Sequence, residues 1–134
     1  MACLDTNVLI NLVRGGDGAQ QATAKLDSLR ARGLVLCTTR FNLAEMYVGA
    51  VRSADRAAEE AAIEAVVRRL VILEFDDRAA RFFGEITASL QRMGRPAGDM
   101  DVLIASTAMA DGRLLVTRNP AHFVNIARLQ VESY

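Results

Sequence analysis

The sequence predicts a three-layer α/β/α fold, in which helices cover both faces of a mostly parallel sheet of four to five short strands. Short apolar runs at residues 2–4, 34–38, 71–75 and 114–117 alternate with longer segments of helical spacing. Strands of a sheet that is covered on both faces are apolar along their whole length, because neither side meets water. Strands that alternate with helices are joined by crossovers, which place neighbouring strands parallel.

The first half of the chain is expected to hold two strands and four helices. In chain order these are a strand at 2–4, a helix at 8–14, a helix at 18–32, a strand at 34–38, a helix to about residue 52 and a helix at 54–70. Gly15 and Gly16 end the first helix and Gly33 ends the second, as glycine commonly does. Thr38 or Thr39 provides the N-cap of the third helix. The fourth is rich in Ala, Glu and Arg, with an apolar stripe at helical spacing.

The second half is expected to hold two further core strands and an edge strand. In chain order these elements are a strand at 71–75, a helix to about residue 93, a loop at 94–98, a helix at 100–111, a strand at 114–117, a turn or short helix at 119–125 and an edge strand at 129–133. Asp76 or Asp77 opens the first of these helices, and Gly112 ends the second. The loop GRPAG is too short to link two domains.

Length and composition are those of a single globular domain, residues 1–134. Hydrophobic residues make up 51% of the chain, and the formal net charge is zero, so no global field attracts nucleic acid. No apolar run approaches the roughly 18 residues of a membrane span, and no signal-peptide pattern opens the sequence. The two cysteines, Cys3 and Cys37, lie in apolar segments without CxxC spacing. We expect buried thiols rather than a disulfide, which indicates the cytoplasm.

Several polar residues follow the predicted strands at the ends where parallel α/β sheets bind ligands. Asp5 directly follows the first strand, and Asn119 comes two residues after the fourth. Asp99 and Asp101 begin the helix that leads back to the start of the fourth strand, so they too belong at the carboxyl edge. Because the carboxyl ends of parallel strands meet at one edge, these side chains are expected to lie together.

Glu45 joins this group because its helix places it among apolar neighbours, with Phe41 and Val48 on the same face. A carboxylate in such a stripe is costly to desolvate unless a cation compensates it. Asp101 shares a face with an apolar stripe in the same way.

Three of these residues also have a simpler structural explanation when each is taken alone. Asp5 caps the following helix, Asp99 caps the helix at 100–111, and Asn119 is a turn residue before a proline. The single histidine, His122, is expected to pack or lie on the surface rather than bind a metal.

Taken together, the acids favour a bound cation. Several carboxylates at one edge repel each other and cannot all stay ionised without a counterion. Oxygen-only ligands suit Mg²⁺ or Mn²⁺, and the lack of a His or Cys cluster argues against zinc. The sequence therefore predicts a divalent-metal site.

Three segments resemble the PIN-domain ribonucleases, and most closely the VapC toxins of bacterial toxin–antitoxin pairs. They are CLDTNVLI (residues 3–10), TTRFNLAEMYVG (38–49) and GRPAGDMDVLIASTAMADGRLLVTRNPAHF (94–123). The resemblance covers nearly the whole chain and keeps the order of the motifs. The DxLIA…G…LVTxN segment is its most specific part.

Carried over residue by residue, the resemblance implies a ligand set and a reaction. Asp5, Glu45 and Asp101 match the family's metal-binding acids, and Asp99 matches a variably acidic position that is also a candidate ligand. Asn119 matches the end of a TxN/TxD motif, and its lack of charge would hold a second ion less tightly. The implied catalytic residues are Asp5, Glu45, Asp101 and Asn119, with Thr6 and Thr117 as nearby polar positions.

The implied activity is Mg²⁺- or Mn²⁺-dependent endonucleolytic hydrolysis of RNA by the toxin of a toxin–antitoxin pair. Such a metal lowers the pKa of bound water and stabilises charge on the phosphate. The resemblance also implies a cognate antitoxin and a homodimer. Candidate RNA contacts are Arg14, Arg40 and Arg118, which flank the motifs.

Other functions remain open at this stage. Asp5 could be the nucleophile of a phosphohydrolase, although the acid expected two residues on is replaced by Asn7. The chain could also be a PIN-like module that binds RNA or protein without cutting, or a nuclease for structured DNA.

Overall fold

The computed structural model describes residues 1–112 and 114–134, so Arg113 within the third quoted segment lies outside the described residues. The described elements are β1 (Ala2–Leu4), α1 (Thr6–Arg14), α2 (Asp17–Ala31), β2 (Leu36–Thr39), α3 (Arg40–Arg52), α4 (Arg56–Val67), β3 (Val71–Leu73), α5 (Asp77–Arg92), α6 (Asp99–Ala110), β4 (Leu114–Val116), the 3-10 helix η1 (Pro120–Phe123) and β5 (Val131–Glu132). The predicted alternation of strands and helices is confirmed.

The five strands form one parallel sheet in the order β3-β2-β1-β4-β5. Cys3 of β1 lies beside Cys37 of β2 on one side and Leu115 of β4 on the other. The central strand therefore ends between β2 and β4, and the residues that follow these three strands share one edge. This is the arrangement that the sequence predicted.

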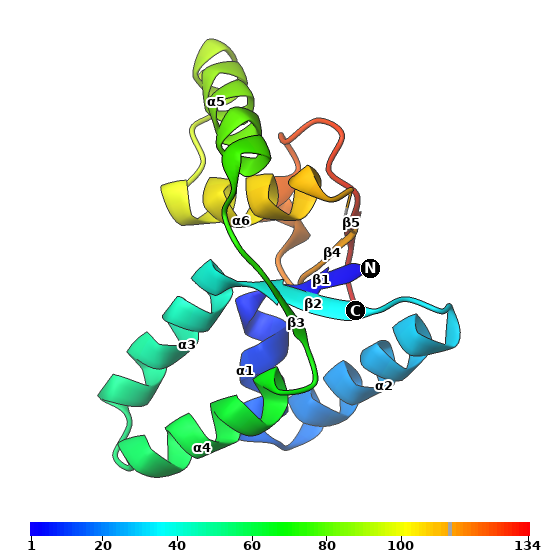
Figure 1. Ribbon diagram of the computed structural model, residues 1–134, viewed down its shortest axis with the longest axis vertical. Helices are drawn as coiled ribbons and strands as arrows, with labels where there is room; N and C mark the ends of the chain where they lie inside the picture. The colour runs from blue at the N-terminus through cyan, green and yellow to red at the C-terminus, as the bar shows by residue number, and fades with distance from the viewer. Residues whose placement is uncertain (113) are drawn as a thin grey trace.

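Helices cover the two faces of the sheet, with α1 to α4 on one side and α5 and α6 on the other (Figure 1). Side chains alternate between the faces along β1. Ala2 and Leu4 join a core with α1 to α4, and Cys3 joins a second core with α5 and α6. Both cysteines are fully buried, as predicted, and the Cys37 thiol donates to the backbone oxygen of Ala2 at 3.3 Å.

The helix starts follow capping chemistry. Helix α1 begins two residues earlier than predicted, because Asp5 caps it by accepting a hydrogen bond from the Thr6 N–H at 2.9 Å. Thr39 caps α3, as predicted. The predicted alternative that Asp99 caps the next-to-last helix is wrong, because Gly98 is the N-cap of α6 and Asp99 is its first residue.

Within the described residues, no helix combines the length and apolarity needed to cross a bilayer.

We predict that Ile63 is the main apolar anchor of α4. Its side chain is 1% exposed and belongs to the core with α1 and α3. Truncation of a buried isoleucine leaves a cavity, so Ile63→Ala should lower the free energy of unfolding by about 2–5 kcal/mol. Val51→Ala, at a side chain that is 56% exposed, should change it by less than about 0.5 kcal/mol. Urea denaturation of both variants is the measurement, and equal losses would contradict the prediction.

Candidate metal and active site

Asp5 is the centre of the candidate site. The residue is 7% exposed and lies where β1 passes into α1. Its Oδ1 accepts hydrogen bonds from the Thr6 N–H and from Asn42 Nδ2, at 2.9 and 3.0 Å. Its Oδ2 accepts one from the Thr117 hydroxyl at 2.7 Å. The carboxylate is thus held from α1, α3 and the end of β4, and it also serves as a helix cap, so the structural and functional interpretations of this residue are compatible.

Glu45 is connected to Asp5 through Thr6 and Asn42. The Thr6 hydroxyl donates to Glu45 Oε1 at 2.7 Å and itself accepts a hydrogen bond from Asn42 Nδ2 at 2.9 Å. Glu45 is half-buried in the middle of α3. The prediction that Glu45 lies at the same edge as Asp5, although the two are far apart in the sequence, is therefore supported by a continuous chain of hydrogen bonds.

Asn42 was not identified from the sequence, yet it organises this part of the site. It is fully buried, and its Nδ2 donates to both Asp5 and Thr6. Its Oδ1 accepts from the hydroxyl and the N–H of Thr39, at 2.6 and 3.2 Å, which completes a reciprocal cap at the start of α3. The Thr-x-x-Asn spacing is the one signal that could have revealed this cap.

Asp101, in the first turn of α6, is near enough to Asp5 for the two negative charges to interact. Burial raises the pKa of the Asp101 carboxyl above its ordinary value, the neighbouring His122 offsets part of this rise, and the negative charge of Asp5 adds to it. His122 Nδ1 lies 3.4 Å from Asp101 Oδ2. His122 is exposed, as predicted, but its contact with Asp101 was not anticipated.

The two remaining site candidates lie differently. Asn119 is exposed after β4, and its N–H donates to the Thr117 hydroxyl at 3.0 Å. The same hydroxyl donates to Asp5, so Thr117 connects the Asn119 backbone to the Asp5 carboxylate. Asp99 is exposed at the start of α6. Within the described residues, its side chain has no hydrogen bond or ion pair that connects it to the other acids.

The predicted RNA-contacting arginines are dispersed. Arg40 pairs with Glu74 on the surface. Arg118 lies over the ring of Tyr134, with 5.3 Å from its guanidinium carbon to the ring centroid. Arg14 lines a cavity between α1, α3 and α4 that Glu45 also borders.

The donor chemistry fits a hard divalent cation, because carboxylate, hydroxyl and amide oxygens surround the edge. Across residues 1–112 and 114–134, however, no group of three or more His, Cys, Asp or Glu side chains is arranged to hold a metal ion. Asp5 and Glu45 are engaged by hydroxyl and amide donors, and Asp101 by His122. The ligand set Asp5, Glu45, Asp101 and Asp99 therefore stays a prediction, and ion binding would require these side chains to converge.

The fold and the site define a parallel α/β domain whose carboxyl edge carries acids from three separate segments. The chain belongs to the PIN domain family, whose model matches residues 2–129.

Curated relatives resemble the chain along nearly its whole length. A protein of Shigella flexneri named tRNA(fMet)-specific endonuclease VapC is 31% identical over 131 residues, covering 98% of this chain and 96% of the relative. Ribonuclease VapC2 of Haemophilus influenzae is 30% identical with the same coverage.

Solved structures give the same result for the fold. The crystal structure of VapBC2 from Rickettsia felis, bound to a DNA fragment from their promoter, contains a chain that is 27% identical, with a TM-score of 0.90 and coverage of 99% of this chain and 98% of that one. A chain of DNA-bound VapBC from Salmonella typhimurium is 30% identical, with a TM-score of 0.87 and the same coverage. The PIN-like fold predicted from the sequence is confirmed.

We predict that Asn42 contributes more to stability than an ordinary helix cap. Asn42→Ala removes the donor to Asp5 and Thr6 and leaves buried polar groups unpaired, which costs about 1–3 kcal/mol per group. Asp55→Ala removes the cap of α4, which bonds only the Ala58 N–H, and should cost about 1 kcal/mol. Chemical denaturation of the two variants tests the difference, and an equal cost would show that Asn42 acts as a cap alone.

Proposed function

We propose that this protein is a divalent-metal-dependent endoribonuclease and the toxin of a toxin–antitoxin pair. The observation that carries the proposal is the buried Asp5 carboxylate, which is linked to Glu45 by hydrogen bonds and interacts electrostatically with Asp101 within a PIN domain. The curated relatives named as VapC ribonucleases support the reaction, and the VapBC complexes support the biological setting.

The surroundings of each site residue suggest its role in the reaction. Asp5, Glu45 and Asp101 would hold an Mg²⁺ or Mn²⁺ ion, with Asp99 as a further candidate ligand. When bound, such an ion would lower the pKa of a bound water and stabilise negative charge on the phosphate. Thr6 and Asn42 orient Asp5 and Glu45 through their hydrogen bonds. Asn119, whose N–H contacts the Thr117 hydroxyl, would use its uncharged amide to orient water or the phosphate.

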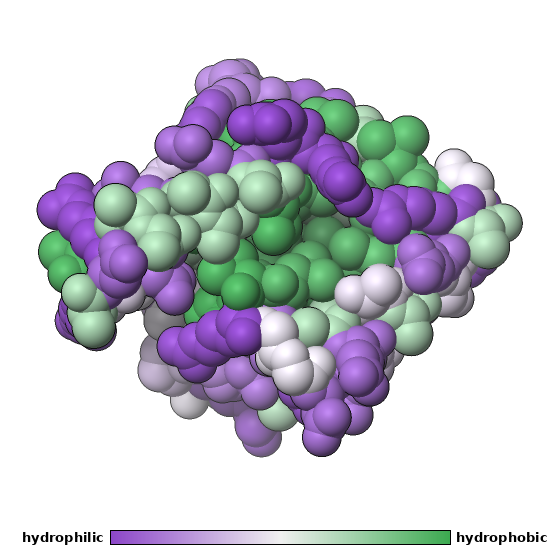
Figure 2. Space-filling model, turned by 90° about the horizontal axis from the view of Figure 1, so that it is seen from below, coloured by the Kyte–Doolittle hydropathy of each residue, from purple (hydrophilic) through white to green (hydrophobic). Residues whose placement is uncertain are grey.

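A partner surface accompanies this proposal. On the side of α1 to α4, the molecule shows an apolar hollow with a hydrophilic rim (Figure 2). A cavity of about 430 Å³ between α1, α3 and α4 has Ile10, Val13 and Met46 among its apolar lining and Arg14 and Arg52 among its charged lining. Exposed apolar surface of this kind marks protein-binding sites. We assign it to the antitoxin, and we expect the toxin to form a homodimer.

The environment of Asp5 argues against the phosphohydrolase alternative. A nucleophilic carboxylate needs an oxygen that can approach phosphorus, but both oxygens of Asp5 accept hydrogen bonds and the residue is 7% exposed. Ion binding makes a smaller demand, because each carboxylate oxygen has further lone pairs and need not move to form a covalent bond. The presence of all three acids that the family resemblance implies, Asp5, Glu45 and Asp101, also disfavours a non-catalytic module.

We predict that Asp5→Asn abolishes RNA cleavage and leaves the fold intact. The amide loses the charge and one acceptor for its three donors, so a stability loss of only about 1 kcal/mol is expected. Wild-type cleavage of single-stranded RNA should cease with EDTA and return with Mg²⁺ or Mn²⁺. Asp55→Asn, which keeps a good cap at a remote position, is the matched control. Cleavage by Asp5→Asn at the wild-type rate would refute the assignment.

We also predict that Asp101 links ion binding to stability. Its carboxylate is partly desolvated and faces the charge of Asp5, so Asp101→Asn should raise the melting temperature in EDTA. Added Mg²⁺ or Mn²⁺ should raise the melting temperature of the wild type, because a ligand that binds only the folded state stabilises it. The variant should gain much less. An identical metal-induced shift in both proteins would remove Asp101 from the ligand set.

A further inference from the structure

A second, smaller cavity borders the candidate site at Asp101. It has a volume of about 250 Å³ and lies between the loop that joins α5 to α6 and the segment that contains η1. Leu90 and Ile126 contribute buried apolar side chains to its lining. Asp101 and His122, which contact each other, also line this cavity. The cavity and the candidate site therefore have Asp101 in common.

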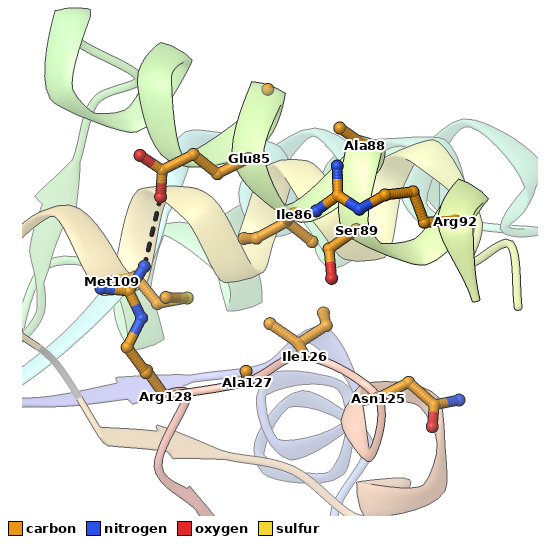
Figure 3. Close-up of a pocket in the computed structure, with 11 residues that line it drawn as sticks. Glu85, Ile86, Ala88, Ser89, Arg92, Met109, Asn125, Ile126, Ala127 and Arg128 are labelled. Atoms are coloured by element: carbon orange, nitrogen blue, oxygen red, sulfur yellow. Dashed lines mark hydrogen bonds and ion pairs between the residues drawn. The ribbon is translucent and has the colours of Figure 1, made fainter.

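The polar lining of this cavity is available to a ligand. Arg95 and Asn125 both line it, and in the described structure neither side chain has a hydrogen bond or ion pair. The Asn125 amide points away from the larger cavity beneath α5, which it also borders (Figure 3). Arg95 is on a defined loop, since its N–H donates to the Leu90 oxygen at 3.0 Å and Gly94 adopts a positive φ of 62°. The cavity thus combines buried apolar side chains with polar side chains that have no partner within the part of the protein that the structure describes.

We propose that this cavity binds one unstacked nucleobase of the RNA substrate, next to the bond that is cut. This inference rests on the proposed function. A base lies one sugar away from its phosphate, so a cavity that shares Asp101 with the active site is where the base of a flanking nucleotide falls. Proteins that read single-stranded RNA stack splayed bases on aromatic or guanidinium planes and hydrogen-bond their edges. The His122 ring, with 58% of its side chain exposed, supplies the stacking plane, and Arg95 and Asn125 supply the hydrogen bonds.

The lining favours a base over a phosphate group. The cavity combines apolar side chains with the opposite charges of Asp101 and Arg95, so an anion meets repulsion from one side as well as attraction from the other. Its volume is below the roughly 300–1,000 Å³ of cavities for drug-sized ligands, which suits a single aromatic ring system.

The larger cavity of about 550 Å³ between α5 and residues 125–128 is a weaker candidate. None of the acids of the site lines it, and its Arg128 is engaged by Glu85 at 3.2 Å (Figure 3).

The test measures binding of a short single-stranded oligoribonucleotide to the full chain carrying Asp5→Asn, so that cleavage does not interfere. Each nucleotide in turn is replaced by an abasic ribose, and fluorescence anisotropy gives Kd. One abasic position should weaken binding by roughly tenfold, which is the size of a lost base stack. Added Asn125→Ala or Arg95→Ala should weaken binding of the intact oligonucleotide, and have no further effect on the oligonucleotide with that abasic position. Arg68→Ala, an exposed arginine at the end of α4, is the matched control and should leave Kd unchanged.

Two results would overturn the base-binding proposal. One is an abasic series without any sensitive position, and the other is a pocket variant that weakens the intact and abasic oligonucleotides by the same factor. The proposed function fails by a different observation, namely wild-type protein that leaves the same oligonucleotide intact with Mg²⁺ and with Mn²⁺.

Discussion

The site depends on one interaction, the burial of the Asp5 carboxylate at the end of the central strand. A buried charge is costly unless hydrogen bonds replace the lost water. Here Thr6, Asn42 and Thr117 provide three such bonds, and the Asp5 N–H donates to the Val116 oxygen of β4 at 2.9 Å. These contacts join α1, α3 and β4 at one point. The same hydrogen bonds that make the charge tolerable also fix where it points, so fold stability and site geometry have a common origin here.

Much of this arrangement could be predicted from the sequence, because short apolar runs and capping residues act locally. The sequence also placed the carboxyl ends of the parallel strands at one edge, whereas the order that puts β1 beside β4, and so Asp5 beside Thr117, came from the structure. The sequence offered Asp99 as a cap of α6, but the structure uses Gly98, because both residue types are accepted there and the choice depends on how the preceding loop enters the helix.

Contacts between distant segments were the part that sequence reasoning missed. Asn42 reads as an ordinary polar residue of a helix, and its role appears only when α3 is packed against the start of α1. His122 reads as a surface residue, and its contact with Asp101 arises because η1 folds back over α6. Such pairings depend on tertiary packing, for which local patterns carry no information. The shape of a cavity, such as the one beside Asp101, belongs to the same category.

The acids of the site come from opposite layers of the molecule. Glu45 is followed by Met46, which is buried in the core with α1 and α4, whereas Asp101 is followed by Val102, buried in the core with α5. The sheet lies between these cores, and α3 and α6 contact each other at its edge. Because packed interiors deform little, the separation of the two carboxylates is set by how both cores are filled. Residues such as Met46 and Val102 therefore belong to the geometry of the site without touching a substrate. An ion held by Glu45 and Asp101 would in turn tie the two layers together across the carboxyl edge.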